Sequence, residues 1–194
     1  MKKMIVLAAL AACGVGAVQA QESPWMVRVR ATNLAMDNKN ETTVAGLAAS
    51  DKTIPEVDVS YFFSPNVAAE LVLTVPQKHD VTTSGGPLGT FKHLPPTLLA
   101  QYHFTNFNGF KPYVGAGINY TKISSVQLGG PTLDNHSWGF AYQAGVDIPL
   151  DKKWSLNFDV KKIHIKTNVY SAGTNLGTLK LDPVAASVGV GYRF

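Results

Sequence analysis

Apolar residues recur at every second position in eight stretches of this chain. Two-residue alternation predicts a β-strand with one apolar face and one polar or small face, because successive side chains point to opposite sides of a strand. The alternating apolar positions are Trp25, Val27, Val29 and Ala31; Val57, Val59, Tyr61 and Phe63; Ala69, Leu71, Leu73 and Val75; Leu98, Ala100, Tyr102 and Phe104; Val114, Ala116, Ile118 and Tyr120; Trp138, Phe140, Tyr142, Ala144, Val146 and Ile148; Trp154, Leu156, Phe158 and Val160; and Val184, Ala186, Val188, Val190, Tyr192 and Phe194. The sequence therefore predicts an all-β fold of eight strands.

The connections between these stretches alternate between long and short. Short turns occupy residues 64–66, 105–110 and 149–153, and the other connections are longer. Beyond residue 20 no stretch approaches the ~18 consecutive apolar residues of a membrane-spanning helix, and the other structure that satisfies the backbone in lipid is a closed barrel. We therefore expect an eight-stranded antiparallel transmembrane β-barrel with short periplasmic turns and four longer extracellular loops.

Aromatic residues gather near the strand ends, where a membrane protein places them at the level of the lipid headgroups. Tyr120 and Trp138 mark the outer end of the predicted barrel. The aromatic residues near the periplasmic end are Trp25, Phe63, Phe104, Trp154, Tyr192 and Phe194.

The N-terminus has the pattern of a secretory signal peptide. Lys2 and Lys3 precede an apolar run over residues 4–18, and the small residues Val18 and Ala20 fit a cleavage site. We expect residues 1–20 to be removed and residues 21–194 to form the barrel in the outer membrane of a Gram-negative bacterium. One alternative is a membrane anchor, although the run is shorter than the ~20 residues of a spanning helix. Another is cleavage before Cys13 as in a lipoprotein, which would leave the apolar residues 14–20 on the mature chain.

Composition narrows the function further. Without Lys2 and Lys3, the 17 basic residues become 15 against 13 acidic ones, so the mature chain has a net charge of only +2. No basic cluster remains to suggest a nucleic-acid partner. Cys13 is the only cysteine, so the mature barrel has no disulfide.

The predicted inward face carries charges of both signs. Buried charges persist when they are paired and hydrogen-bonded, so we expect an ion-pair network in the lumen; a polar conduit is the alternative. The network is expected to include Arg28, Arg30, Asp58, Glu70 and Asp159, with Glu56, Asp147, Lys161 and Arg193 also inward. An eight-stranded barrel is narrow enough to be filled by such side chains. Beyond Lys161 the apolar phase moves to Ile163 and Ile165, which suggests a bulge or an exit from the bilayer.

Catalytic and metal-binding patterns are absent from the sequence. The five histidines lie on separate predicted strands and loops without ligand spacing, so we expect no metal and no cofactor. His164, Ser171 and Asp182 surround one loop, but they form no motif and no Gly-x-Ser-x-Gly elbow occurs. We therefore expect a protein that is not an enzyme.

Several segments resemble the outer membrane protein W (OmpW) family over essentially the whole mature chain. They are Phe91-Lys92-His93-Leu94-Pro95-Pro96-Thr97-Leu98-Leu99-Ala100-Gln101, Tyr113-Val114-Gly115-Ala116-Gly117-Ile118-Asn119-Tyr120-Thr121, Ser137-Trp138-Gly139 and the ending Gly191-Tyr192-Arg193-Phe194. The His-Leu-Pro-Pro-Thr run is the most specific of them. The ending with Tyr192 and Phe194 also resembles the signal that the barrel assembly machinery recognises.

The resemblance implies a narrow, largely apolar lumen that passes small hydrophobic compounds, and in some members a bacteriocin receptor. The family's apolar constriction corresponds here to Val72, which preserves its character, and to Lys161, which departs from it. Our hypothesis is a barrel in the lipid of the outer membrane that binds or passes small, mainly hydrophobic solutes, with Phe62, Val72, Leu99 and Lys161 as lumen contacts. The alternative is a surface anchor or receptor whose extracellular loops bind a host, phage or bacteriocin partner.

Overall fold

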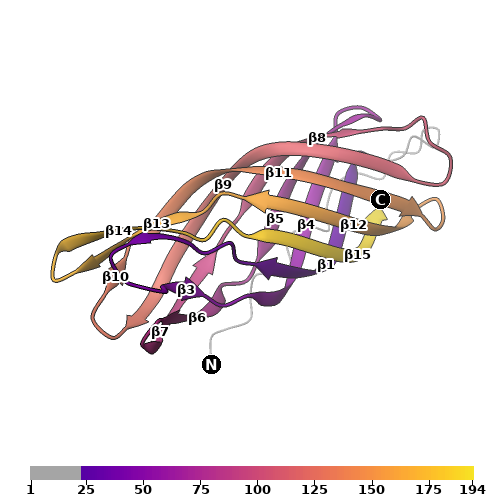
Figure 1. The fold of residues 1–194 in the computed structure, drawn as a ribbon. Helices are drawn as coiled ribbons and strands as arrows, with labels where there is room; N and C mark the ends of the chain where they lie inside the picture. Colours follow the sequence, from indigo (N-terminus) through magenta and orange to yellow (C-terminus); the bar gives the residue numbers. More distant parts are fainter. Residues whose placement is uncertain (1–22) are drawn as a thin grey trace, which may run out of the picture.

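The computed structural model describes residues 23–194, and the predicted signal peptide lies outside the described residues. Eight long antiparallel strands form a closed ring in the order β11-β12-β15-β1-β4-β5-β8-β9, and β9 pairs with β11 to complete it (Figure 1). The predicted fold class is confirmed. The barrel strands are β1 (Trp25–Ala35), β4 (Lys52–Phe62), β5 (Val67–Thr74), β8 (Thr97–His103), β9 (Lys111–Leu128), β11 (His136–Pro149), β12 (Trp154–Ile163) and β15 (Val184–Arg193).

The connections predicted as extracellular loops contain strands of their own. Three of these strands extend the barrel sheet beside the upper half of β9, and four form a second sheet with the order β10-β13-β14-β2. Figure 1 shows both extensions at the end of the barrel opposite the C-terminus. The first group is β3 (Ala48–Ala49), β6 (Gln77–Thr83) and β7 (Gly86–Leu94); the second is β2 (Lys39–Thr42), β10 (Thr132–Leu133), β13 (Lys166–Ser171) and β14 (Thr174–Lys180).

Burial in this barrel is the reverse of that in a soluble protein. Outward side chains such as Val29 and Phe140 are 52% and 64% exposed, whereas the inward Arg28 and Asp58 are fully buried. This distribution is that of a transmembrane barrel, whose outer face contacts acyl chains and whose polar residues face the lumen.

The bulge predicted after Lys161 is wrong. Lys161 pairs with Gln143 and Ile163 pairs with Ala141 in one unbroken register. Both Lys161 and Ile163 are buried on the inner face. The change from charged to apolar residues along β12 therefore marks a change in the contents of the lumen, because the side chains keep their direction.

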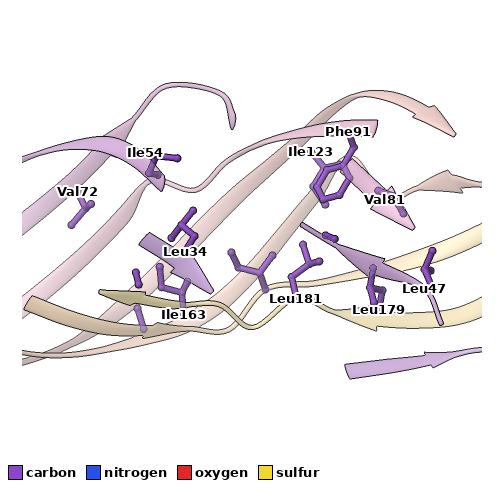
Figure 2. Packing of buried hydrophobic residues seen from close by; sticks show 14 of the residues in the cluster. Leu34, Leu47, Ile54, Val72, Val81, Phe91, Ile123, Ile163, Leu179 and Leu181 are labelled. Carbon is purple, nitrogen blue, oxygen red and sulfur yellow. The ribbon is translucent and has the colours of Figure 1, made fainter. Parts of the chain in front are cut away.

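Above the charged level, the interior of the barrel is mainly apolar, although it also holds buried polar side chains such as Thr97, Asn119 and Thr121. Val72 and Leu99 of this apolar cluster pair with the charged residues Asp58 and Glu70, and Phe91 and Val81 lie in the extracellular extension. Figure 2 shows the labelled side chains of the cluster following one another from Val72 toward Leu47. The buried cluster comprises Leu34, Leu47, Ala49, Ile54, Val72, Val81, Phe91, Leu99, Ile123, Ala141, Ile163, Ile165, Val169, Leu179, Leu181 and Ala185. The lumen thus has a charged lower layer and a mainly apolar upper layer.

Candidate functional site

Arg28 is the centre of the charged layer. Its Nε and Nη2 donate to the two carboxylate oxygens of Asp147, at 3.1 and 2.7 Å. Its Nη1 lies 3.2 Å from Asp58 Oδ1 and 3.1 Å from Glu70 Oε2. One guanidinium therefore joins three carboxylates from three strands. Such a fork suits arginine, whose planar group makes several directed hydrogen bonds at once.

Two more cations complete the charged layer. Arg30 contacts Glu56 Oε1 at 3.1 Å and Asp58 Oδ2 at 2.9 Å. Lys161 Nζ donates to Glu56 Oε1 at 2.8 Å and to Asp159 Oδ1 at 2.7 Å. Register explains part of this arrangement, because Arg28 pairs directly with Asp58 and Arg30 with Glu56 across β1 and β4. We call these eight side chains the ion network: Arg28, Arg30, Lys161, Glu56, Asp58, Glu70, Asp147 and Asp159.

Neutral side chains satisfy further lone pairs of the carboxylates. Tyr113 Oη donates to Asp159 at 2.8 Å, and Asn157 Nδ2 donates to Asp147 at 2.8 Å. Gln143 Nε2 donates to Glu70 at 2.8 Å. Every member of the ion network is at most 4% exposed. The network therefore fills the lower lumen as a paired and hydrogen-bonded plug, the form in which buried charges are tolerated.

Gly145 makes room for the ring of Tyr113. A Cβ at Gly145 would lie 2.4 Å from Tyr113 Cζ and 2.7 Å from the carbonyl oxygen of Phe158. We expect Gly145→Ala to lower the free energy of unfolding by about 1–3 kcal/mol, the usual cost of overpacking a full core. Urea unfolding in lipid vesicles measures this change. Gly85→Ala is the control because the nearest atom to its Cβ is 3.6 Å away, and an equal loss in both variants would contradict the steric role.

Arg28, Arg30, Asp58, Glu70 and Asp159, the five residues predicted for the charge network, all lie in the ion network. The predicted solute contacts, in contrast, are separated. Val72 and Leu99 belong to the apolar cluster. Lys161 belongs to the ion network. Phe62 lies at the periplasmic end, in a small apolar group with Met26 and Ala68.

A pocket of about 970 Å³ opens at the periplasmic end of the barrel, and Phe62 lines it. Arg193, which was predicted to face the other lumen charges, also lines this pocket. Its Cζ lies 4.2 Å from the centre of the Phe62 ring, and its Nε donates to the Ser23 carbonyl at 2.9 Å. The ion network separates this pocket from the apolar cluster.

Two buried histidines in the extracellular extension were not identified from the sequence as part of the interior. The rings of His79 and His93 stack with their centres 4.5 Å apart, and Phe91 stacks on His79. Burial lowers the pKa of His79, and burial together with His79 lowers the pKa of His93 to about 3. The alternation of Gln77, His79 and Val81 with charged residues is the signal that could have placed them inside. No group of three or more His, Cys, Asp or Glu within residues 23–194 could hold a metal ion.

The backbone pairing between neighbouring strands of the barrel wall is interrupted beside Val75 and Pro76. Pairing between β4 and β5 ends at Glu56 and Thr74, and resumes at Ala49 and Val81 between β3 and β6. On the other side of the same segment, pairing between β5 and β8 ends at Val72 and Thr97, and resumes at Gln77 and His93 between β6 and β7. Four prolines border these two gaps: Pro55 pairs with Ala31 of β1 but has no partner on β5, and Pro76, Pro95 and Pro96 lie outside the strands. Proline has no backbone N–H, so these positions leave no donor unsatisfied when the ladder is interrupted.

Residues 16–194 match the model of the OmpW family. The chain is 44% identical over 190 residues to the uncharacterized outer-membrane protein y4mB of Sinorhizobium fredii, covering 91% of this chain and 82% of that protein. It is 32% identical to outer membrane protein W of Vibrio cholerae, covering 98% and 97%. It is 28% identical to the dibenzothiophene metabolism operon protein PahQ of Pseudomonas aeruginosa, covering 100% and 99%.

Solved structures agree with these relatives. The crystal structure of OprG from Pseudomonas aeruginosa superimposes with a TM-score of 0.77 at 26% identity, covering 89% of this chain and 97% of OprG. The solution structure of outer membrane protein W from E. coli gives a TM-score of 0.66 at 28% identity, covering 91% and 100%. The chain belongs to the OmpW family, non-enzymatic β-barrels of the bacterial outer membrane.

Proposed function

We propose that this barrel takes small, mainly apolar solutes into its extracellular half and releases them through the wall into the bilayer. The observation that carries the proposal is that the apolar cluster ends on the ion network at the level where the wall loses its ladder. Val72, at the lower end of the apolar cluster, pairs with Asp58 of the network and is the last β5 residue paired with β8.

The ion network makes continued passage down the lumen unfavourable for an apolar solute. A solute at Leu99 would have to separate Arg28 and Arg30 from their carboxylates to go further. Separating a buried pair leaves charges without partners and costs several kcal/mol. Leaving through the wall instead exchanges an apolar protein interior for acyl chains.

The two gaps beside Val75 and Pro76 are the part of the wall that can open at the lowest cost. Opening a paired region breaks backbone hydrogen bonds in lipid, where no water replaces them. Between residues 51–55 and 75–79 the strands have no ladder pairs to break. Ile54 and Val72 lie directly behind this segment, and both are buried. In the closed state these side chains pack together, so a solute passes only when they move apart.

The relatives support an apolar solute. PahQ is named for an operon of dibenzothiophene metabolism, and dibenzothiophene is a flat, uncharged aromatic molecule. On a route through the wall, such a solute contacts Val72 and Leu99. Phe62 and Lys161 lie beyond or within the ion network and do not contact it.

Val72→Trp tests this route. The larger side chain points into the lower end of the apolar cluster, so we expect uptake of an aromatic hydrocarbon into liposomes to fall about tenfold, as for a barrier raised by about 1.4 kcal/mol. Leu71→Trp is the matched control, because Leu71 is the neighbouring outward residue on β5 and is 41% exposed. Heat-modifiable migration on a gel confirms that each variant is folded.

Two results would end the proposal: uptake by the native barrel no faster than by empty liposomes, or equal uptake by Val72→Trp and Leu71→Trp. Single-channel recording separates the wall from the lumen. Exit through the wall predicts no ion conductance through the plugged lower lumen, whereas clear conductance steps would indicate a polar conduit.

We also propose that Tyr192 and Phe194 form the signal for the barrel assembly machinery. Their rings and that of Trp154 form an outward-facing aromatic row at the periplasmic end, with neighbouring centres 4.9 and 5.1 Å apart. Both outward side chains are accessible to another protein before the barrel enters the bilayer.

A further inference from the structure

Three lysines form a row on the outward face of the extracellular extension. Lys78 on β6 pairs directly with Lys92 on β7. Lys92 in turn pairs with Ser124 on β9, and Lys122 lies two residues further along the same face of β9. All three lysines are exposed.

No carboxylate of residues 23–194 forms an ion pair with this row. Lys78, Lys92 and Lys122 have no ion-pair partner among residues 23–194, and Asp80 on the same face as Lys78 forms no ion pair with it. Other lysines on the extracellular side differ from one another: Lys39 and Lys162 contact Asp37 and Lys180 contacts Glu41, whereas Lys52 and Lys166 form no ion pair within residues 23–194. Like charges directly opposite each other in a sheet are destabilising. The repulsion between Lys78 and Lys92 is therefore not offset by an ion pair within the protein.

The row lies just above the outer aromatic residues. Lys122 pairs with His136, and two residues nearer the membrane Tyr120 pairs with Trp138. The rings of Tyr120 and Trp138 are 4.8 Å apart, and Trp138 is 61% exposed. Aromatic side chains of this kind mark the headgroup level of the bilayer. Two strand residues span about 7 Å and four span about 13 Å, so Lys122 lies about 7 Å beyond Tyr120 along β9, and Lys92 and Lys78, at the level of Ser124, lie about 13 Å beyond it. Phosphorylated sugars of an outer-leaflet glycolipid extend over this range above the acyl chains.

A polar hollow continues the surface beyond His136. It measures about 410 Å³, and Lys166, Ser137 and Thr167 contribute to its lining. Its one carboxylate, Asp134, accepts a hydrogen bond from the backbone N–H of Asn168 at 3.0 Å. Hydroxyl and amide groups beside a basic row suit a sugar that carries phosphate.

We propose that Lys78, Lys92 and Lys122 bind phosphate groups of a phosphorylated glycolipid of the outer leaflet, namely lipopolysaccharide. Charge complementarity and continuity with the lipid-facing surface favour this ligand over a soluble anion. The phosphates supply the negative charge that the sheet lacks, and the acyl chains of the same molecule contact the apolar wall below. The site is separate from the route through the interior, because these lysines point away from the lumen.

The test compares two variants that lose the same number of positive charges. The first carries Lys78→Gln, Lys92→Gln and Lys122→Gln, and the control carries Lys39→Gln, Lys162→Gln and Lys180→Gln. Binding of each folded barrel in detergent is measured with lipopolysaccharide and with the same lipid after removal of its phosphates. Since a basic residue near an anionic membrane surface contributes about 1 kcal/mol, we expect roughly 100-fold weaker binding of intact lipopolysaccharide by the first variant.

The control variant is expected to bind within a few-fold of the native barrel, and the native barrel to prefer the phosphorylated lipid. Three results would overturn the proposal. They are an unchanged affinity in the first variant, an equal loss in the control, and a native barrel that binds both lipids equally. All substituted side chains are outward or exposed, and heat-modifiable migration verifies that each variant is folded.

Discussion

Replacing Arg28 with methionine is expected to lower the free energy of unfolding by about 3–5 kcal/mol, the range for breaking a buried ion pair by removing one partner. Asp58, Glu70 and Asp147 would each lose a contact with a positive charge while remaining inside the barrel. Methionine keeps much of the side-chain volume, so the loss reports the missing charge rather than a cavity. Urea unfolding in lipid vesicles, followed by tryptophan fluorescence, measures it.

Lys39→Met is the matched control for this experiment. The side chain of Lys39 is 64% exposed and contacts Asp37 at 3.1 Å. An ion pair between exposed side chains contributes little to stability, so the control is expected to unfold close to the native protein. If Arg28→Met unfolded at the same urea concentration as Lys39→Met, the ion network would not contribute to the stability of the barrel.

Lowering the pH is expected to open the hairpin of β6 and β7. Burial holds the pKa of His93 at about 3, whereas an exposed histidine has a pKa near 6.5. The closed hairpin therefore binds fewer protons than the open one. Its stabilisation is complete above pH 6.5 and is lost as the pH falls from 6.5 toward 3. Between pH 7.5 and pH 5, His93 alone should increase the open fraction roughly 30-fold, the linkage expected for these two pKa values.

Polar and charged groups surround the rings of His79 and His93. His79 Nδ1 lies 2.7 Å from the Ser50 carbonyl oxygen, and Asp80, Asp51 and Lys52 are the nearest charged residues. Amide hydrogen exchange at pH 7.5 and pH 5, corrected for the intrinsic rate, measures hairpin opening. His93→Phe keeps a ring without a proton site and should remove much of the pH dependence, while amides of β12 should not respond in either protein. An equal pH response of the native hairpin and His93→Phe would contradict the role of His93.

The barrel itself could be predicted because each of its strands separates two very different environments. Lipid on one side and a polar or charged lumen on the other impose a two-residue repeat, as in residues 138–148. That repeat indicates both the strand and the direction of each side chain. Arg28, Asp58 and Glu70 could be placed inside for the same reason.

The contents of the upper lumen could not be predicted in this way. Ile163 is apolar and faces inward. After Lys161 the apolar residues of β12 therefore lie on the inner face, although the direction of the side chains does not change. Outside the membrane the outward face of a strand contacts water and carries polar residues. The sequences of β6 and β7 therefore resemble polar loops. Their inward residues His79, Phe91 and His93 were therefore not recognised as a buried layer.

Which side chains pair with each other in the ion network could not be predicted fully from the sequence either. Arg28 and Asp58 lie on consecutive barrel strands, so their proximity follows from the topology. Arg28 and Asp147 are 119 residues apart and meet across the lumen. That contact depends on the radius of the closed ring and on the lengths of the side chains, which a pattern of alternation does not determine.

Closure by β1 and β15 has a consequence for biogenesis. Met26 pairs with Arg193, and Phe194 donates to the Trp25 carbonyl, so the last barrel strand in chain order completes the hydrogen bonding of the first one. Before this long-range pairing forms, the barrel is open between β1 and β15. An intermediate in the bilayer that lacked β15 would then hold Arg28 and Arg30 on a strand with unpaired backbone groups. Translocation of the whole polypeptide must therefore precede burial of its charges, which makes insertion and sealing a single cooperative event.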